Sequence, residues 1–566
     1  MVRTIAASLS VALLMALGSG RGAVQAKGAD ALTGTVHSQA EGKMEGVVVT
    51  ARAEGAAMAV SVVSDAKGRY RFPRTHVAPG KYTLKIRAAG YDLASPNTVE
   101  VSAGKTAALD LTLDAAKDPS TQLTSADWLN LVGGTEAQKF SAQKVVVSCT
   151  YCHSLERILK SRHNAEQFVA VINRMQDYFG DGSMVSTEGR GRARVLSQAE
   201  KDANHKNPNW GFYPPTDKKK LGEYLASINQ SGGRALPKAV ASLPRPKGKE
   251  TRVIVTTWDQ PRKDTVSHDS DVDQQGRLWY TDQSDYYLGY LDQKTGTFKE
   301  WPLPKAQHHE FGGGSDVQVG LDGTIYTVVT HDDAQGHFGL PYYFDPKTEK
   351  GDWMTVPPKT GFGQFLAMDK AGFIYVGEGK FDPKTKGLVD RFPWRSDPSL
   401  PKGTHFGYEA GVDSLGNWYI TDFSANLIVR VDAKMKAVTL HEVPTKDSLP
   451  RRGRMDSQDR FWFGEYFGDK IGMFDTKTKT FKEWTAPKWT APYTASVPNK
   501  KGHVFAPSNS SDRVFRLDPK TGEVLAYLMP TMNFDTKQVS IDPLSGTAAI
   551  FANTRNAQIV RVEPID

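Results

Sequence analysis

Short alternations of hydrophobic and polar residues run through most of the chain, and they predict a mainly β protein. In residues 30–115 the runs at 46–51 and 82–86 have this pattern, and turn signals at 65–68 and 79–80 separate them. Successive residues of a strand point to opposite faces of a sheet, so the pattern predicts a small antiparallel β-sandwich.

Helical spacing replaces the alternation between residues 116 and 235. Residues 165–175 place their apolar side chains on one helical face, and residues 218–229 do the same. The Gly- and Arg-rich stretch 180–214 predicts a loop, and residues 231–249 predict a linker.

An internal repeat occupies residues 250–566, where each unit has a strand, a turn, an aromatic-rich strand and the pattern Asp-x-Lys-Thr. Successive turn positions are 47, 49, 44, 43, 43 and 44 residues apart, which is the period of a four-stranded propeller blade. Seven turn positions therefore predict seven blades: Gly276, Gly323, Gly372, Gly416, Asp459, Gly502 and Gly546.

The ends of the repeat region indicate how the ring closes. The last unit ends at residues 559–562, without room for a fourth strand. Residues 252–258 form an apolar strand before the first unit and have no other strand to join. We expect residues 252–258 to complete the last blade, because closure of the ring removes exposed strand edges.

The N-terminus has the pattern of a secretory signal peptide. Arg3 precedes the apolar run 5–17, and residues 24–26 offer small side chains for cleavage. The pattern predicts an exported, periplasmic protein without residues 1–26; an uncleaved membrane anchor is the alternative, although the apolar run is short for a span. Later segments are too polar to cross a bilayer, so we expect no stable membrane span.

Charge and cysteine content narrow the function classes. The 566-residue chain has a net charge of +8, but its Lys and Arg residues form no dense run, so we expect no nucleic-acid binding. We interpret the charge as a solvated basic surface, with docking on an acidic redox partner as the alternative. The chain has two cysteines in one short motif, so a disulfide framework is excluded.

Both cysteines belong to the motif Cys149-Thr150-Tyr151-Cys152-His153, which is typical of covalent haem c attachment. The thiols of such a motif form thioethers with the haem, and the histidine binds the iron. The alternatives are a redox-active Cys pair, which needs a βαβ setting, and a zinc site, which needs more ligands nearby. The motif predicts one covalent haem, held by Cys149, Cys152 and His153.

The expected sixth iron ligand is Met175, with Met184 in the following loop as the alternative. The helix that ends with Met175 resembles the haem domain of quinohemoprotein amine dehydrogenase and cytochrome c domains fused to propellers, and the choice of Met175 is what this resemblance implies. A core methionine is the competing interpretation. A His/Met haem transfers electrons rather than binding oxygen.

Two further segments resemble known families. The pattern Asp-x-x-Gly-x-Tyr-x-Phe at 65–72, with Gly90-Tyr91, is similar to the carboxypeptidase regulatory-like domain, which implies an accessory or adhesion module. The repeat at 268–282 resembles virginiamycin B lyase (streptogramin lyase), which implies a propeller, but the lyase's Glu-x-His metal pair is not evident.

The predicted fold class is mainly β and multidomain, with a β-sandwich (30–115), a short α-helical cytochrome c-like domain (120–235) and a seven-bladed β-propeller (250–566).

The repeat register predicts polar residues at one end of the ring. Each turn joins the innermost strand of a blade to the second strand, so the start of the first and the end of the second lie on the same rim. Seven or eight residues before the turns are the catalytic candidates His268, Asp269, Asp316, Glu409 and Arg452. Six residues after the turns are the expected ligands of a rim cation, Mg²⁺ or Ca²⁺: Asp282, Asp422 and Glu465.

Clustered carboxylates raise one another's pKa or bind a hard cation, and His268 among them is a candidate base or metal ligand. Alternatively, these acids are turn residues that face solvent. The adjacent pair His308-His309, with Glu310, is expected on the same rim but carries less weight, because adjacent histidines do not easily bind one metal. Three more histidines are candidates for this mouth: His331, His337 and His405.

These features favour a periplasmic oxidoreductase or electron-transfer protein. In this hypothesis the propeller rim binds a small-molecule substrate, and the haem passes electrons to a redox partner, a cytochrome or a copper protein. One alternative is a metal-dependent lyase or hydrolase of a cyclic ester with an accessory haem, and another is a non-catalytic electron carrier or binding protein. The sequence names neither the substrate nor a quinone cofactor.

Overall fold

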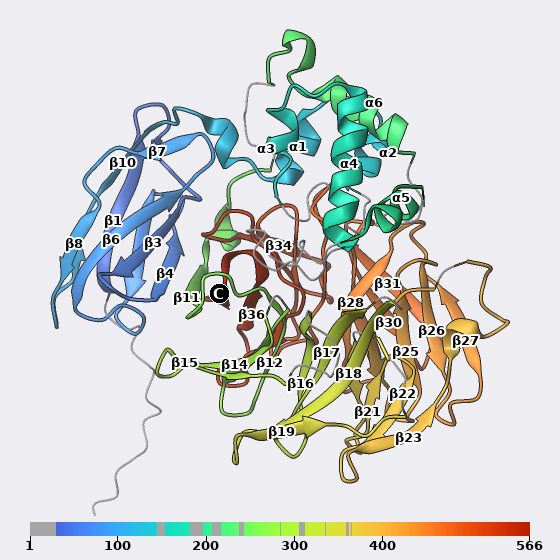
Figure 1. Cartoon of the computed structure of the whole chain (residues 1–566). Helices are drawn as coiled ribbons and strands as arrows, with labels where there is room; N and C mark the ends of the chain where they lie inside the picture. The colour runs from blue at the N-terminus through green and yellow to red at the C-terminus, as the bar shows by residue number, and fades with distance from the viewer. Residues whose placement is uncertain are drawn as a thin grey trace, which may run out of the picture.

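The structure is a computed structural model with a β-sandwich, a helical segment and a ring of sheets (Figure 1). Several sequence predictions lie outside the described residues: the signal peptide 1–26, the cysteines Cys149 and Cys152, Met184, the segment 308–310 and most of the loop 180–214. The described part of that loop contains a helix at residues 198–206, so the prediction of a loop is wrong there. The described residues are 30–143, 153–180, 196–206, 217–236, 243–283, 285–304, 312–333, 336–357, 362–363, 365–403 and 405–566.

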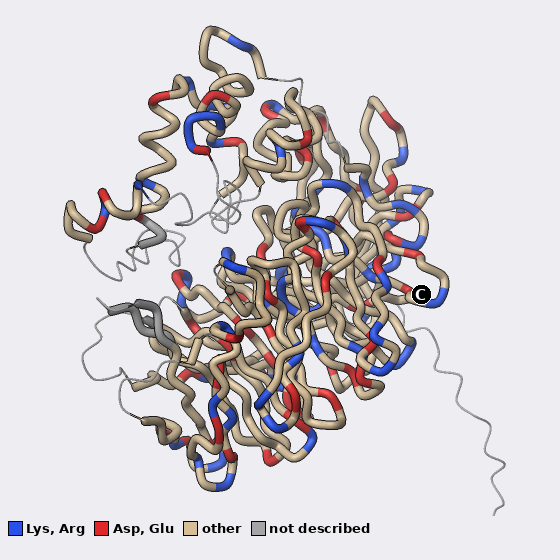
Figure 2. The backbone as a smooth tube through the Cα atoms, turned by 90° about the vertical axis from the view of Figure 1, so that its right-hand side faces the viewer, with Lys and Arg blue, Asp and Glu red and all other residues tan. Residues whose placement is uncertain are grey.

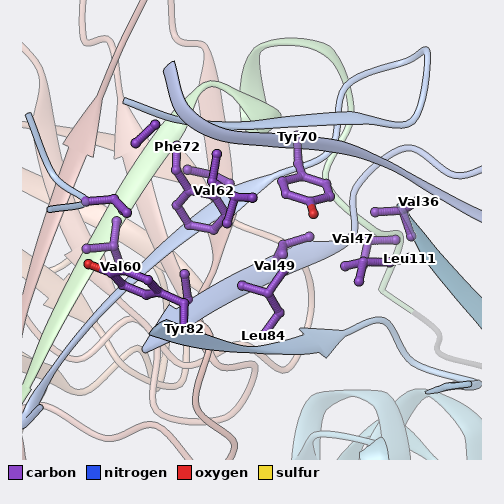
Figure 3. Packing of buried hydrophobic residues seen from close by; sticks show 14 of the residues in the cluster. Val36, Val47, Val49, Val60, Val62, Tyr70, Phe72, Tyr82, Leu84 and Leu111 are labelled. Atoms are coloured by element: carbon purple, nitrogen blue, oxygen red, sulfur yellow. The ribbon is translucent and has the colours of Figure 1, made fainter. Parts of the chain in front are cut away.

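Residues 30–115 form the predicted sandwich, whose inward-facing side chains, including Val49, Tyr70 and Leu84, are buried between the sheets (Figure 3). The pairings of β1 with β10 and with β9 are parallel, so the prediction of a wholly antiparallel sandwich is wrong at these two pairs. One sheet contains β2 (Gly42–Lys43), β1 (Asp30–Ser38), β10 (Leu111–Ala115), β7 (Tyr91–Leu93), β5 (Arg69–Pro73) and β9 (Ala107–Ala108). The other contains β4 (Met58–Val63), β3 (Val48–Ala53), β6 (Gly80–Arg87) and β8 (Thr98–Val101).

The segment between the sandwich and the ring is helical, and α4 and α6 confirm the two helices expected from the spacing of apolar residues. Phe168 and Ile172 of α4 pack against Leu221 and Leu225 of α6, so these two helices share one apolar core. The helices are α1 (Ser125–Leu131), α2 (Glu136–Gln143), α3 (Glu156–Leu159), α4 (Ala165–Gly180), α5 (Gln198–Lys206) and α6 (Lys218–Ile228).

Consecutive antiparallel sheets follow one another around the ring, as the repeat predicts. Sheet one is β12 (Ser267–Val272), β13 (Arg277–Asp282), β14 (Tyr287–Asp292) and β15 (Thr297–Pro302); sheet two is β16 (Gly312–Val319), β17 (Ile325–Asp333), β18 (Gly336–Asp345) and β19 (Lys350–Trp353). Sheet three is β20 (Leu366–Met368), β21 (Ile374–Val376), β22 (Gly379–Asp382) and β23 (Gly387–Arg391); sheet four is β24 (Gly407–Val412), β25 (Trp418–Asp422), β26 (Leu427–Val431) and β27 (Val438–Glu442). Sheet five is β28 (Pro450–Met455), β29 (Arg460–Glu465), β30 (Lys470–Asp475) and β31 (Thr480–Thr485); sheet six is β32 (Val504–Pro507), β33 (Arg513–Leu517) and β34 (Val524–Leu528).

Sheet six differs from the expected four-stranded blade. Its inner position is taken by an irregular segment, in which Tyr493 N donates to Pro507 O at 2.9 Å and Ser496 N donates to Phe505 O at 2.9 Å. These bonds hold the segment beside β32 without forming a regular ladder. The segment therefore lies where an innermost strand would lie.

The seventh sheet closes the ring in the predicted way. It consists of β35 (Ser540–Ile541), β36 (Ala549–Asn553), β37 (Gln558–Pro564) and β11 (Val253–Asp259). Strand β11 pairs with β37 along its whole length, from Val253 opposite Pro564 to Asp259 opposite Gln558. Strand β12 packs beside β36, which brings the first sheet next to the last.

The other edge of β11 was not expected to be paired. It pairs with β4 of the sandwich, with Ile254 opposite Val62 and Trp258 opposite Met58. The sandwich sheet and the seventh blade are therefore one continuous eight-stranded sheet. A buried ion pair between Arg87 and Asp512, at 2.5 Å, adds a second link between the sandwich and the ring.

The turn residues confirm the register of the repeat. Gly276, Gly323 and Gly416 have φ between 82° and 84°, and Asp459 has φ 64°. In each of these turns the backbone N–H donates to the carbonyl three residues earlier, at 2.9–3.1 Å. Glycine adopts a positive φ without steric cost, which explains why it recurs at this position.

Over the ring and the helical segment, Lys and Arg are interspersed with Asp and Glu in the view of Figure 2, which is typical of a solvated surface. Within the described ranges, the helices are too short or too polar to span a membrane.

We predict that Thr256→Pro destabilises the protein by about 3 kcal/mol or more, because proline removes a ladder hydrogen bond from a strand that is paired on both edges. Thermal unfolding monitored by circular dichroism measures the effect. Thr256→Val keeps the ladder and is the control. Equal unfolding temperatures for the two variants would show that β11 does not hold both sheets.

Candidate functional site

Four inner strands carry irregularities at the positions of the rim candidates. Antiparallel pairing slips between residues 267 and 270 in β12, and between 314 and 317 in β16. It also slips between 407 and 409 in β24, and between 450 and 453 in β28. Such bulges redirect side chains, and they recur next to functional sites.

The bulges bring the five catalytic candidates together as a buried central cluster, defined here as His268, Asp269, Asp316, Glu409 and Arg452. Arg452 Nη1 lies 2.7 Å from Asp269 Oδ2 and 3.2 Å from Glu409 Oε2. Residues from the first, fourth and fifth blades therefore meet through one guanidinium group.

Gln538 also contacts the central cluster, and the sequence analysis missed it. Its Nε2 donates to Glu409 Oε2 at 3.0 Å, and its Oε1 accepts from Thr494 Oγ1 at 2.9 Å. Gln538 lies eight residues before Gly546, and Thr494 lies eight before Gly502. His268 was found by counting eight residues back from its turn. The same count from the last two turns finds Thr494 and Gln538.

His268 is held as a neutral imidazole. Its Nδ1 lies 3.2 Å from Asp269 Oδ2 and 3.1 Å from Ser315 O, so Nδ1 is the protonated nitrogen that donates to them. Burial lowers the pKa of His268, although Asp269 opposes this effect. The remaining nitrogen, Nε2, then carries the lone pair that can accept a proton.

The carboxyl groups of the cluster differ in protonation. Burial and repulsion by Glu409 raise the pKa of Asp316 well above its ordinary range, and burial raises the pKa of Glu409. Burial also opposes ionisation of Asp269, but Arg452 and His268 hold its pKa below the ordinary value. The cluster thus combines Asp269, whose surroundings favour the ionised form, with Asp316, whose surroundings favour the protonated form, a pairing suited to moving protons.

The three expected rim ligands do not share one site. Asp282 pairs with Arg262 at 2.7 Å and accepts from Val266 N at 3.1 Å, and Asp422 binds His405. Each acid ties its second strand to the loop that leads into its own blade. Across the described residues, no group of three or more His, Cys, Asp or Glu side chains is arranged to hold a metal ion.

Glu465 is the third of these acids, and it is buried near Glu483. Burial and repulsion by Glu483 raise the pKa of Glu465 to about 8. All three acids are buried, so they are not solvent-facing turn residues. His331 and His337 lie in β17 and β18, near the end of their shared hairpin.

A second buried group, the aromatic cluster, surrounds Arg451 with Tyr408, Phe423, Tyr466 and Tyr493. The guanidinium carbon lies 3.8 Å from the Tyr466 ring centre and 4.6 Å from that of Tyr493. The hydroxyl groups of Tyr408 and Tyr493 are hydrogen-bonded. Although burial acts in the other direction, neighbouring cations lower the pKa of Tyr408, so the potential here is positive.

Adjacent residues link the two clusters. Tyr408 and Glu409 are neighbours in β24, and Arg451 and Arg452 are neighbours in β28. In each pair, one side chain joins the aromatic cluster and the next joins the central cluster. The two clusters are therefore consecutive layers inside the ring.

The helical segment packs on the end of the ring nearest the aromatic cluster. Phe140 of α2 makes an edge contact with Phe467, with ring centres 5.5 Å apart. Gln143 Nε2 donates to Trp489 O at 3.1 Å. Phe467 in turn contacts Tyr466 of the aromatic cluster, with ring centres 4.7 Å apart.

His153, the described residue of the haem motif, fits an iron ligand. It is partly buried, and its Nδ1 lies 2.9 Å from Ser154 O, so the protonated nitrogen is Nδ1 and the lone pair is on Nε2. Burial lowers the pKa of His153, with smaller effects from Arg157 and Arg555, so the ring stays neutral. Met175 is half-buried on α4 and stays a prediction as the sixth ligand.

Comparison with known families agrees with the sandwich prediction. The carboxypeptidase regulatory-like domain family matches residues 31–114. A comparison with curated proteins gives no match.

Solved structures that resemble the chain cover a little more than half of it. Virginiamycin B lyase from Staphylococcus aureus is 17% identical, with 55% of this chain and 100% of that chain covered and a TM-score of 0.47. A streptogramin B lyase is 16% identical, with 56% and 99% covered and a TM-score of 0.47. The protein U3-55K is 7% identical, with 54% and 98% covered and a TM-score of 0.43.

We predict that Glu465→Gln stabilises the protein, and that the gain grows between pH 5 and pH 8. The unfolded chain ionises near the ordinary pKa of 4.5, whereas folded Glu465 ionises near 8, so native Glu465 lowers stability as the pH rises through this window. Unfolding temperatures at both pH values measure the gain, and Glu442→Gln on the exposed end of β27 is the control.

The same experiment with added Mg²⁺ or Ca²⁺ tests the rim-cation hypothesis. A bound cation would hold Glu465 ionised and remove the gain. Without added cation, an equal gain in unfolding temperature at pH 5 and pH 8 would contradict the raised pKa of Glu465.

Proposed function

We propose that the chain is an exported c-type haem protein that oxidises a small molecule in the central cluster. Cys149 and Cys152 would hold the haem covalently, and His153 and Met175 would bind its iron. When bound, the haem supplies one-electron acceptance and passes electrons to a partner cytochrome or copper protein. The observation that supports this proposal most is that the segment carrying His153 packs on the ring end that leads, through the aromatic cluster, to the central cluster.

The residues of the central cluster have separate roles in this proposal. Asp269 orients the neutral His268, whose Nε2 accepts a proton from the substrate. Arg452 keeps Asp269 ionised and orients it, and Asp316 stores a proton. Burial of all these side chains excludes water and strengthens their mutual interactions.

The test uses the exported protein with its haem attached. Candidate small-molecule substrates are added without oxygen, and the visible spectrum reports reduction of the haem. Reduction by a substrate supports the proposal, whereas a haem that stays oxidised across a broad panel contradicts it. Turnover of a cyclic ester that survives Cys149→Ala in folded protein would favour the lyase alternative instead.

We predict that His268→Gln slows substrate-dependent haem reduction about 100-fold or more, because the variant lacks the proton acceptor. The oxidised visible spectrum stays unchanged, since His268 is not an iron ligand. His441→Gln, on the outer strand β27, is the matched control and keeps the native rate. Equal rates for the two variants would remove His268 from the reaction.

A further inference from the structure

Blades six and seven end in a group of polar side chains, several of which carry buried atoms without a hydrogen-bond partner among the described residues. We call Asn509, Ser510, Asn553, Thr554 and Arg555 the polar cradle. Both amide atoms of Asn509, Ser510 Oγ, Asn553 Nδ2 and Thr554 Oγ1 are buried, and none has a hydrogen-bond partner within the part of the chain that the structure describes.

This concentration of unpaired polar atoms is unusual. More than nine in ten buried polar groups in proteins are hydrogen-bonded. A buried donor or acceptor left without a partner costs about 1–3 kcal/mol. Several such atoms at one place indicate a ligand that supplies the missing partners.

The repeat places the two asparagines at equivalent positions. Asn509 lies seven residues after Gly502, and Asn553 lies seven residues after Gly546. The equivalent residues of blades four and five are Phe423 and Tyr466, which belong to the aromatic cluster. The cradle is therefore a property of blades six and seven and not of the repeat as a whole.

Contacts place the cradle beside His153. Ala126 N donates to Ser510 O at 2.8 Å, and Leu155 N donates to the neighbouring Ser125 Oγ at 3.4 Å. Leu155 is two residues after His153. From the other blade, Arg555 lies close enough to His153 for their charges to interact.

The charged groups around the cradle favour an anion. Lys537 and Arg555 both face Asp535, at 2.8 and 3.5 Å, so two cations share this carboxylate. Arg157 of α3 adds positive potential at His153. The cradle offers amide, hydroxyl and guanidinium donors, which are the groups that bind carboxylates.

We propose that the polar cradle binds the propionate carboxylates of the haem, an inference that rests on the haem attachment in the proposed function. Haem carries two propionates, and the motif attaches it beside His153. Asn509, Asn553 and the two hydroxyl groups donate to the carboxylates, and Arg555 balances their charge. The seventh blade, which closes the ring, thereby takes part in holding the cofactor.

The experiment compares Asn509→Leu and Ser510→Ala with the native protein, each exported with haem. Neither substitution removes a side-chain hydrogen bond that the structure shows, so both variants should fold. We expect the propionate bending bands in the resonance Raman spectrum to shift in both variants. Unchanged bands in both variants would overturn the inference.

Arg555→Gln gives an independent readout, with Arg561→Gln as the matched control in the same blade, where Arg561 pairs with Asp542. Loss of the Arg555 charge should lower the midpoint potential of the haem and move the propionate ionisation step in its pH profile to higher pH. Arg561→Gln should leave the step in place. If the propionate ionisation step of the Arg555→Gln variant occurred at the native pH, this result would contradict the proposed binding.

The haem content separates the two proposals. A native protein without covalent haem in its pyridine haemochrome spectrum would overturn both the proposed function and the cradle. If haem is attached but every variant keeps the native Raman bands and pH profile, the proposal that the cradle binds the propionates is overturned. The proposed function is then unaffected.

Discussion

The double pairing of β11 is the constraint on which the rest of the structure depends. One edge of the strand closes the ring by pairing with β37, and the other edge continues the sheet into the sandwich through β4. A strand bonded on both sides has no exposed edge, so closure and domain attachment are achieved by the same seven residues, Val253–Asp259. The helical segment is then fixed at both ends, by the sandwich before it and by β11 after it.

This constraint explains why His153 lies near the seventh blade. A segment that leaves β10 and must return to β11 is held close to the seventh blade, and its helices pack on the nearby end of the ring. His153 is thereby brought within the electrostatic influence of Arg555. The buried charges of the central cluster are tolerated because Arg452 pairs with two carboxylates, and because burial and repulsion by Glu409 raise the pKa of the further carboxyl, Asp316.

Features set by local rules could be predicted from the sequence. The turn glycines recur because the turn requires a positive φ, and the ring closure follows from counting strands in the last unit. The central cluster was predicted because the same offset from each turn places residues on the same rim. The attachment of the sandwich could not be predicted, because the pairing of β4 with β11 joins residues about two hundred positions apart with no local signal.

The acids six residues after the turns show where the register argument fails. Equivalent positions in the repeat place Asp282 and Asp422 at the same level along the axis of the ring, but they do not determine the direction in which each side chain points. Each one turns to its own loop, where Arg262 or His405 binds it. Thr494 and Gln538 lie eight residues before the last two turns, from which the sequence analysis did not count back.

Hydrogen–deuterium exchange of β11 tests the central claim most directly. Strand β8 is the edge strand of the same eight-stranded sheet and serves as the internal reference. If β11 is paired on both edges, its amides, at residues 253–259, exchange among the slowest in the protein and far more slowly than those of residues 98–101 in β8. Exchange of β11 as fast as that of β8 would contradict the continuous sheet and, with it, this account of how the helical segment is held on the ring.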